Sequence, residues 1–206
     1  MFENDYYENE DFSDCIISMD ELTRKKFVNC KFNKADFKDI STIFNCTFDS
    51  CDFVSAYFNG VNIKNCAFLS CKFKFANFFA AKFDECKMTG SSFLDSDCSF
   101  AEIVGGDWSY TELRNLDFSK QKFDGTRFSG ADLTGSRFGN CKFKECEFDE
   151  AIMHETSFFG SDIRTSSFNN IDFLGINLKN AKVDLQQCIT IAEALMEVKY
   201  MPEKKE

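Results

Sequence analysis

The sequence predicts an all-β solenoid of four-sided coils, about eight or nine of them, with a short C-terminal α-helix at one end. Three observations lead to this fold class. A large apolar residue recurs at every fifth position, and a small residue stands two positions before most of these large ones. This rhythm ends at Val183, where the apolar residues take up helical spacing instead.

The chain begins with an acidic stretch, residues 1–11, which we expect to form an N-terminal tail. The solenoid is expected over residues 12–183. Its first register of large residues runs from Phe12 to Phe37 and then slips by one residue. The second register runs from Ile43 to Val183 without interruption.

A period of five fits neither an α-helix, with 3.6 residues a turn, nor a strand, with a period of two. It fits a coil in which the large residue and the small one before it both point to the axis. Four such units make a square turn of about 20 residues, and successive turns stack at the spacing of parallel strands, about 4.8 Å. Residues 20 apart should therefore lie directly above one another. Four inward positions, Leu116, Gln121, Ile171 and Ile176, hold larger residues and mark expected local distortions.

Residues 184–200 are expected to form a helix that closes the solenoid, and residues 201–206 a tail. Asp184 is suited to the N-cap position. Leu185, Cys188, Ile189, Ala192, Leu195 and Met196 then lie near one stripe of the helix. Two interpretations remain open: the helix is a monomer's cap, or its spare apolar surface pairs with a second copy.

The sequence contains eleven cysteines, some in pairs such as Cys66 and Cys71. Nine of them fall on the small inward position, and Cys98 and Cys188 fall on the large-residue register. Free cysteine packs well as a small buried residue. Stacked cysteines 20 apart are close enough for a disulfide in principle, but a reducing compartment disfavours one. The spacing does not suit a zinc site, which needs converging pairs of ligands. We interpret the cysteines as packing residues.

No catalytic constellation stands out, and we expect neither enzymatic activity nor a cofactor or metal. His154 is the single imidazole and lies at an outward position. The sequence has no nucleophile elbow, P-loop or paired-histidine motif. It also lacks a signal peptide and a run of 18 apolar residues, so a cytoplasmic protein with no membrane contact is expected.

The net charge of −10 argues against direct binding of nucleic acid, because phosphates would be repelled. Within residues 41–180 the acid excess falls on two adjacent sides of the predicted coil, those of the Phe48 and the Phe53 columns. Each of these sides carries a net charge of −3 from the counts of its acids and bases. The negative charge has two interpretations: it keeps the rod soluble, or it forms an acidic surface that docks at the DNA-binding site of a partner.

Segments such as "ADFKD", "ANFFA" and "ADLTG" resemble the consensus of the pentapeptide-repeat family, which implies a right-handed quadrilateral β-helix. The layout, with the ending "LKNAKVDLQQC", is similar to the Qnr quinolone-resistance proteins. That resemblance implies a DNA-mimicking homodimer that binds DNA gyrase and topoisomerase IV and protects them from fluoroquinolones. The chain lacks the two loops that interrupt the repeats in many members, and it resembles the loopless chromosomal type.

The resemblance also assigns surfaces by residue. The acidic surface expected to meet the topoisomerase comprises Asp49, Asp52, Asp95, Asp107, Glu112, Asp132, Glu147, Asp149, Glu150, Glu155 and Asp172. The dimer contact is expected to comprise Leu185, Ile189, Ile191, Ala192, Leu195, Met196 and Val198. One alternative is an interaction or immunity protein with another partner or against a natural gyrase-directed toxin, and another is a purely structural repeat protein. Protection and inhibition of gyrase are both open at this point.

Overall fold

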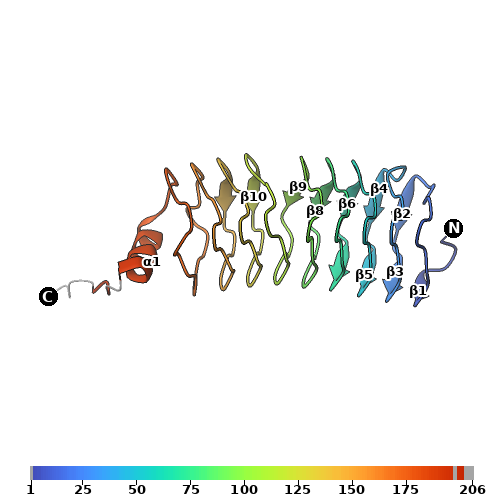
Figure 1. The fold of residues 1–206 in the computed structure, drawn as a ribbon, viewed down its shortest axis with the longest axis horizontal. Helices are drawn as coiled ribbons and strands as arrows, with labels where there is room; N and C mark the ends of the chain where they lie inside the picture. Colours follow the sequence, from blue (N-terminus) through green and yellow to red (C-terminus); the bar gives the residue numbers. More distant parts are fainter. Residues whose placement is uncertain (1, 197–198, 202–206) are drawn as a thin grey trace.

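The structure, a computed structural model, describes residues 2–196 and 199–201 as an elongated rod (Figure 1). The N-terminus lies at one end, and the one helix of the described residues, α1 (Leu185–Met196), lies at the other. Eleven three-residue strands mark the sides of the coils. They are β1 (Tyr6–Glu8), β2 (Glu21–Thr23), β3 (Lys26–Val28), β4 (Thr42–Phe44), β5 (Thr47–Asp49), β6 (Asn62–Lys64), β7 (Ala67–Leu69), β8 (Lys82–Asp84), β9 (Glu102–Val104), β10 (Lys122–Asp124) and β11 (Lys142–Lys144).

Every strand pairing is parallel, and the strands stack in the order β1-β3-β5-β7, β2-β4-β6-β8-β9 and β10-β11. We name the four sides of the coil faces A to D in chain order. Face A contains the β1 sheet, and isolated bridges extend its ladder to Ser167. Its nine stacked residues are Tyr6, Lys26, Thr47, Ala67, Lys87, Asp107, Arg127, Glu147 and Ser167. Nine rungs agree with the eight or nine coils expected from the sequence.

The other faces have the same construction. Face B carries a ladder of bridges that includes Asp52, Lys72, Ser92, Glu112, Asp132 and Ile152. Face C carries the ladders that include Asp36, Tyr57, Asn77 and Asp97, and then Asp117, Arg137, Ser157 and Asn177. Face D holds the β2 sheet and the β10–β11 pair.

The core is a set of stacked aromatic columns along the axis of the rod. Phe48 and Phe68 stack with ring centroids 4.6 Å apart, and Phe37 and Phe58 stack at 4.5 Å. These separations match the rung spacing of a parallel ladder, so each ring packs on the ring one coil away. Trp108 is the bulkiest member and is fully buried. The inward residue before it is Gly106, where an added Cβ would collide with the carbonyl oxygen of Cys86.

The one-residue slip is confirmed. Ile16 pairs with Asp36, 20 residues on, whereas Asp36 pairs with Tyr57, 21 residues on. Glu21 and Thr42 are likewise 21 apart. The extra residue therefore lies between Asp36 and Thr42, at the corner of faces C and D, where Ile40 is buried.

The expectation of an N-terminal tail over residues 1–11 is wrong. Tyr6–Glu8 forms β1 and pairs with β3, and Phe2 is buried against Tyr7, Phe12 and Phe27. The physical reason is that Phe2 and Tyr7 continue the five-residue register backward from Phe12. Phe2 thereby covers the open end of the aromatic columns.

Candidate partner-binding surface

All eleven residues of the predicted acidic surface point outward, and none of them is buried. Face A carries Asp49, Asp107, Glu147, Asp149 and Glu150, and face B carries Asp52, Asp95, Glu112, Asp132, Glu155 and Asp172. Because successive coils are in register, these carboxylates form a stripe along the rod rather than a single pocket. On face B the ladder from Asp52 to Ile152 spans five rung steps, about 24 Å at the usual strand spacing.

Cation pairing divides face A into a neutralised and an acidic part. The Arg127 guanidinium lies between two carboxylates, with Nε 2.9 Å from Glu147 Oε2 and Nη1 3.6 Å from Asp107 Oδ2. Partial burial raises the pKa of Asp107, but hydrogen bonds from Ser109 and the charge of Arg127 outweigh it, so that pKa lies below its ordinary value. The charge of Arg127 therefore offsets part of the negative charge of Asp107 and Glu147.

Asp149 and Glu150 form the acidic part of face A. Asp149 accepts hydrogen bonds from the backbone N–H and the side-chain amide of Asn169, both at 2.9 Å. Burial raises the pKa of Asp149, and the bonds from Asn169 lower it further than burial raises it. Glu150 is exposed, with no ion pair among the described residues. Neither Asp149 nor Glu150 has an ion-pair partner among the described residues, so this end of face A is not neutralised by a cation.

Face B has a second concentration of charge, where Glu112 and Asp132 occupy neighbouring rungs of one ladder. Arg114 compensates Asp132, with Nε 3.5 Å from Oδ2. Glu112 instead accepts a hydrogen bond from the hydroxyl of Ser92 at 2.5 Å. Like charges on adjacent rungs repel each other, so their presence here is not explained by stability of the sheet.

Arg114 and Arg127 were already counted on these two faces from the sequence, and stacking at 20 residues places residue 127 between residues 107 and 147. The structure adds that both guanidinium groups lie within ion-pair distance of carboxylates of the stripe. The structure does not bring all eleven acids together. Asp49, Asp52 and Asp95 lie toward the N-terminal half of the rod, away from Asp149, Glu150, Glu155 and Asp172.

Faces C and D contain three ion pairs between neighbouring rungs among the described residues. Lys144 contacts Asp124 at 3.0 Å and Lys64 contacts Asp84 at 3.2 Å on face D, and Arg137 contacts Asp117 at 3.0 Å on face C. Among the described residues, no group of three or more His, Cys, Asp or Glu could hold a metal ion. No helix of the described part is long and apolar enough to cross a membrane.

Nine cysteines are buried, which agrees with their interpretation as packing residues. Cys15 is partly exposed. Cys188, expected on an inward register, is exposed instead, because it lies on α1 beyond the end of the solenoid. His154 is exposed, with Nε2 3.6 Å from Glu155 Oε1.

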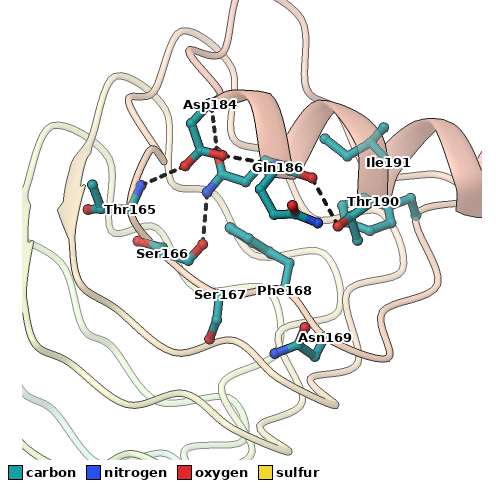
Figure 2. A pocket seen from close by; sticks show the side chains of 11 residues that line it. Thr165, Ser166, Ser167, Phe168, Asn169, Asp184, Gln186, Thr190 and Ile191 are labelled. Carbon is teal, nitrogen blue, oxygen red and sulfur yellow. Dashed lines mark hydrogen bonds between the residues drawn. The ribbon is translucent and has the colours of Figure 1, made fainter. Parts of the chain in front are cut away.

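The start of α1 is fixed to the last coil by two side chains. Asp184 is the N-cap: its carboxylate accepts hydrogen bonds from the backbone N–H of Gln187 at 3.0 Å and of Thr165 at 3.1 Å. Gln187 returns a bond by accepting from the backbone N–H of Asp184, also at 3.0 Å. This reciprocal pair is a capping box, and Figure 2 shows Asp184 between Thr165 and the helix.

Gln187 also seals the open end of the solenoid. Its side-chain amide is buried and donates to the carbonyl oxygens of Ile163 at 2.7 Å and Ser166 at 2.8 Å. These carbonyls would pair with a next coil if one existed. Beside it lies a pocket of about 240 Å³, lined by residues that include Phe168, Phe173 and Ile191 (Figure 2).

The predicted dimer residues divide into two groups. Leu185, Leu195 and Met196 are exposed, with half or more of their surface accessible. Ile189 and Ala192 are half-buried, and Ile191 packs against the solenoid core, so Ile191 belongs to the cap. Val198 lies outside the described residues. The helix ends at Met196, and residues 199–201 are not helical, so the expected range 184–200 was too long in its described part.

Comparison with known proteins identifies the repeat and the fold. The family description "Pentapeptide repeats (8 copies)" matches residues 111–148 and 127–164. Comparison with curated protein sequences gives no match. A trypsin-treated variant of QnrB1, described as a plasmid-mediated fluoroquinolone resistance protein, superposes with a TM-score of 0.78 at 20% identity, covering 95% of this chain and 97% of that chain.

Full-length QnrB1 superposes with a TM-score of 0.71 at 20% identity, covering 92% of this chain and 99% of that one. At this level of identity the likeness establishes the fold. The chain thus contains pentapeptide repeats, and the right-handed quadrilateral β-helix with one short C-terminal helix is confirmed.

Proposed function

We propose that this chain is a DNA-mimic protein that binds DNA gyrase and topoisomerase IV and protects them from fluoroquinolones. The observation that carries the proposal is the acidic stripe on two adjacent faces of a rod whose other two faces are charge-balanced. Its fold is shared with QnrB1, whose description is that of a fluoroquinolone resistance protein. The stripe is the surface that a basic, DNA-binding groove would attract.

The magnitude of the charge sets how far the mimicry extends. Faces A and B carry 11 acids and five bases between residues 41 and 180, a net charge of −6. These seven coils span about 34 Å. A duplex of that length carries about 20 negative charges, at one per 1.7 Å. Faces A and B therefore carry about a third of the charge of the duplex, and we infer that the shape of the rod supplies the rest of its affinity.

This difference gives the proposal a measurable signature. Binding driven by counterion release weakens steeply with added salt. The rod, with fewer charges, should lose affinity for gyrase less steeply than a duplex of equal length does. A dimer joined through the exposed residues of α1 would extend the stripe over two rods, and we include this dimer in the proposal.

A supercoiling assay with purified gyrase, with and without ciprofloxacin, tests the proposal. The expected result is that the protein restores supercoiling in the presence of the drug. The combined change Asp95→Lys, Glu112→Lys and Asp132→Lys on face B should abolish the restoration.

The matched control is Glu85→Lys, Asp124→Lys and Glu145→Lys on face D, which changes the total charge of the protein equally. Circular dichroism establishes that both variants remain folded. If the protein has no effect on gyrase under either condition, the proposed function is wrong. If the two variants lose activity equally, the assignment to the acidic faces is wrong.

A further inference from the structure

Between the coil of residues 96–105 and the coil of residues 116–125, the ladder of backbone hydrogen bonds is interrupted on two of the four faces, C and D. β9 pairs with β8 and β10 pairs with β11, but β9 and β10, neighbours along the rod in Figure 1, belong to separate sheets. On face C the bridges join Asn77 to Asp97 and Asp117 to Arg137, and none joins Asp97 to Asp117 in the described chain. Faces A and B stay continuous here, through Lys87, Asp107 and Arg127 and through Glu112 and Asp132.

The sequence explains why the coils separate at this point. Inward positions that are small elsewhere hold Leu116 and Gln121, while Cys98 stands where a phenylalanine is usual. Leu116 is buried, at 7% exposure. These larger side chains at a narrow corner hold the coil of residues 116–125 away from the coil of residues 96–105 on faces C and D. The distortion expected at these positions is thus a break between residues 96–105 and 116–125.

One side chain already spans the break in the manner of a peptide group. The side-chain amide of Gln121 donates to the carbonyl oxygen of Ala101 at 2.8 Å and accepts from the backbone N–H of Ile103 at 3.2 Å. In an unbroken ladder these two groups would pair with the backbone of Lys122. The gap therefore accepts an amide group that donates and accepts at once.

The rest of the gap has no such occupant. One coil lower, Phe78 donates its backbone N–H to Asp97 at 2.7 Å, and Ala80 donates to Ser99 at 3.0 Å. The corresponding N–H groups of Cys98 and Phe100 make no backbone bond in the described structure. A hollow of about 540 Å³ lies there, lined by Ser99, Phe100, Ala101, Glu102, Asp117, Ser119, Lys120 and Gln121.

Phe100, at the rim of this hollow, is unfavourable for the folded chain by two independent criteria. Its φ of 60° is in the left-handed region, which a bulky residue rarely adopts. Its side chain is 78% exposed. It meets only the edge of another exposed aromatic, Phe79, at a centroid distance of 5.5 Å. Neither backbone preference nor burial accounts for a phenylalanine at this position.

We propose that this hollow binds an extended, uncharged polypeptide segment of a protein partner, with one apolar side chain of that segment packed on Phe100 and Phe79. The N–H groups of Cys98 and Phe100 face the coil that carries the carbonyl oxygens of Asp117 and Ser119, and none of these four groups makes a backbone hydrogen bond in the described structure. The hollow thus offers backbone donors and acceptors together, which a peptide backbone satisfies and a phosphate or a lipid does not. Among the charged residues that line the hollow, Asp117 is paired with Arg137, and Glu102 is balanced by Lys120. Walls without a net charge do not favour a charged side chain on the bound segment.

Nuclear magnetic resonance of the full-length protein tests this site directly. The probe is the blocked peptide acetyl-Ser-Phe-Thr-Val-Ser-amide. The expected result is a set of saturable shifts confined to the amides of Cys98, Phe100 and Ser119 and their neighbours, with a Kd on the order of 1 mM. The same peptide methylated on its backbone nitrogens cannot donate and should produce no saturable shifts.

Two variants serve as a matched pair. Phe100→Asn retains a residue suited to the left-handed turn, as Asn140 is two coils further along face C, and should weaken binding about fivefold or more. Phe75→Asn replaces another exposed phenylalanine with positive φ on face B, and should leave binding unchanged. The absence of saturable shifts, or equal effects of the two variants, or equal binding of the methylated peptide, would overturn the proposal.

Discussion

The side-chain amide of Gln187 should hold helix α1 on the end of the rod. The free energy that is lost when this amide is removed follows from the hydrogen bonds it makes. Gln187→Ala deletes two donated hydrogen bonds, to Ile163 at 2.7 Å and Ser166 at 2.8 Å, and the returning bond to the backbone of Asp184. An unsatisfied buried carbonyl costs about 1–3 kcal/mol and a lost cap about 1 kcal/mol. Water reaches part of the end of the rod, so we expect a loss of about 2–4 kcal/mol in the local free energy of opening.

Hydrogen exchange measured by mass spectrometry reads this loss where it occurs. In a repeat protein the end opens locally, before the whole chain unfolds. The amide of Cys188, which bonds to the carbonyl oxygen of Asp184 at 3.0 Å, should lose about 30- to 1000-fold of its protection, or all of it. Gln186→Ala, at an exposed neighbouring position, is the control and should change protection little.

The variant Gln187→Glu keeps the shape of the side chain but removes its hydrogen-bond donor, so it separates the effect of the donor from the effect of packing. At neutral pH its carboxylate would face two carbonyl oxygens without a proton to donate, so protection should fall as it does in the alanine variant. At acid pH the carboxyl group regains a donor and part of the protection should return. Unchanged protection in Gln187→Ala, or in Gln187→Glu at neutral pH, would refute the role assigned to this amide.

Three further predictions concern thiols, acid and assembly. A thiol reagent at neutral pH should modify Cys188 quickly, Cys15 more slowly, and the nine buried cysteines only after denaturation. The reason is that burial excludes the reagent and raises the pKa of thiols such as Cys86 to about 12. Rapid reaction of a third thiol in the native protein would contradict the packing. The backbone N–H groups of Gln187 and Thr165 lower the pKa of Asp184, so its contribution to stability is present above the unfolded pKa of about 3.9 and is lost as the pH falls. The helical dichroism should accordingly decline below about pH 4, and less so in Asp184→Asn; an equal decline in both would assign the acid sensitivity elsewhere. Leu195→Asp, at an exposed position of α1, should shift the mass seen by light scattering from a dimer to a monomer, and an unchanged mass would mean that α1 is only a cap.

The repeat made most of the fold predictable, because one inward pair in every five residues fixes both the coil and its stacking. The same register would have placed Tyr7 and Phe2 in the first coil had it been followed backward. The strong acidity of residues 1–11 suggested a tail, yet all of those charges point outward in the coil and do not oppose it.

The break at Leu116 and Gln121 was visible in the sequence only as unusual residues. Composition could not show that Gln121 would replace backbone bonds, because that depends on how far the coils move apart. Stacking alone predicted that the eleven acids of the stripe lie on two adjacent faces. The partial neutralisation of the stripe by Arg127 and Arg114 depends on side-chain reach between rungs, which the periodic pattern does not encode.

The central claim is that faces A and B occupy the DNA site of the topoisomerase. Fluorescence anisotropy of a labelled duplex bound to gyrase measures this directly, with the protein added as a competitor. We predict competitive displacement of the duplex, lost in the Asp95→Lys, Glu112→Lys, Asp132→Lys variant and retained in its face D control. Stable binding of the protein to gyrase with the duplex still in place would contradict the claim.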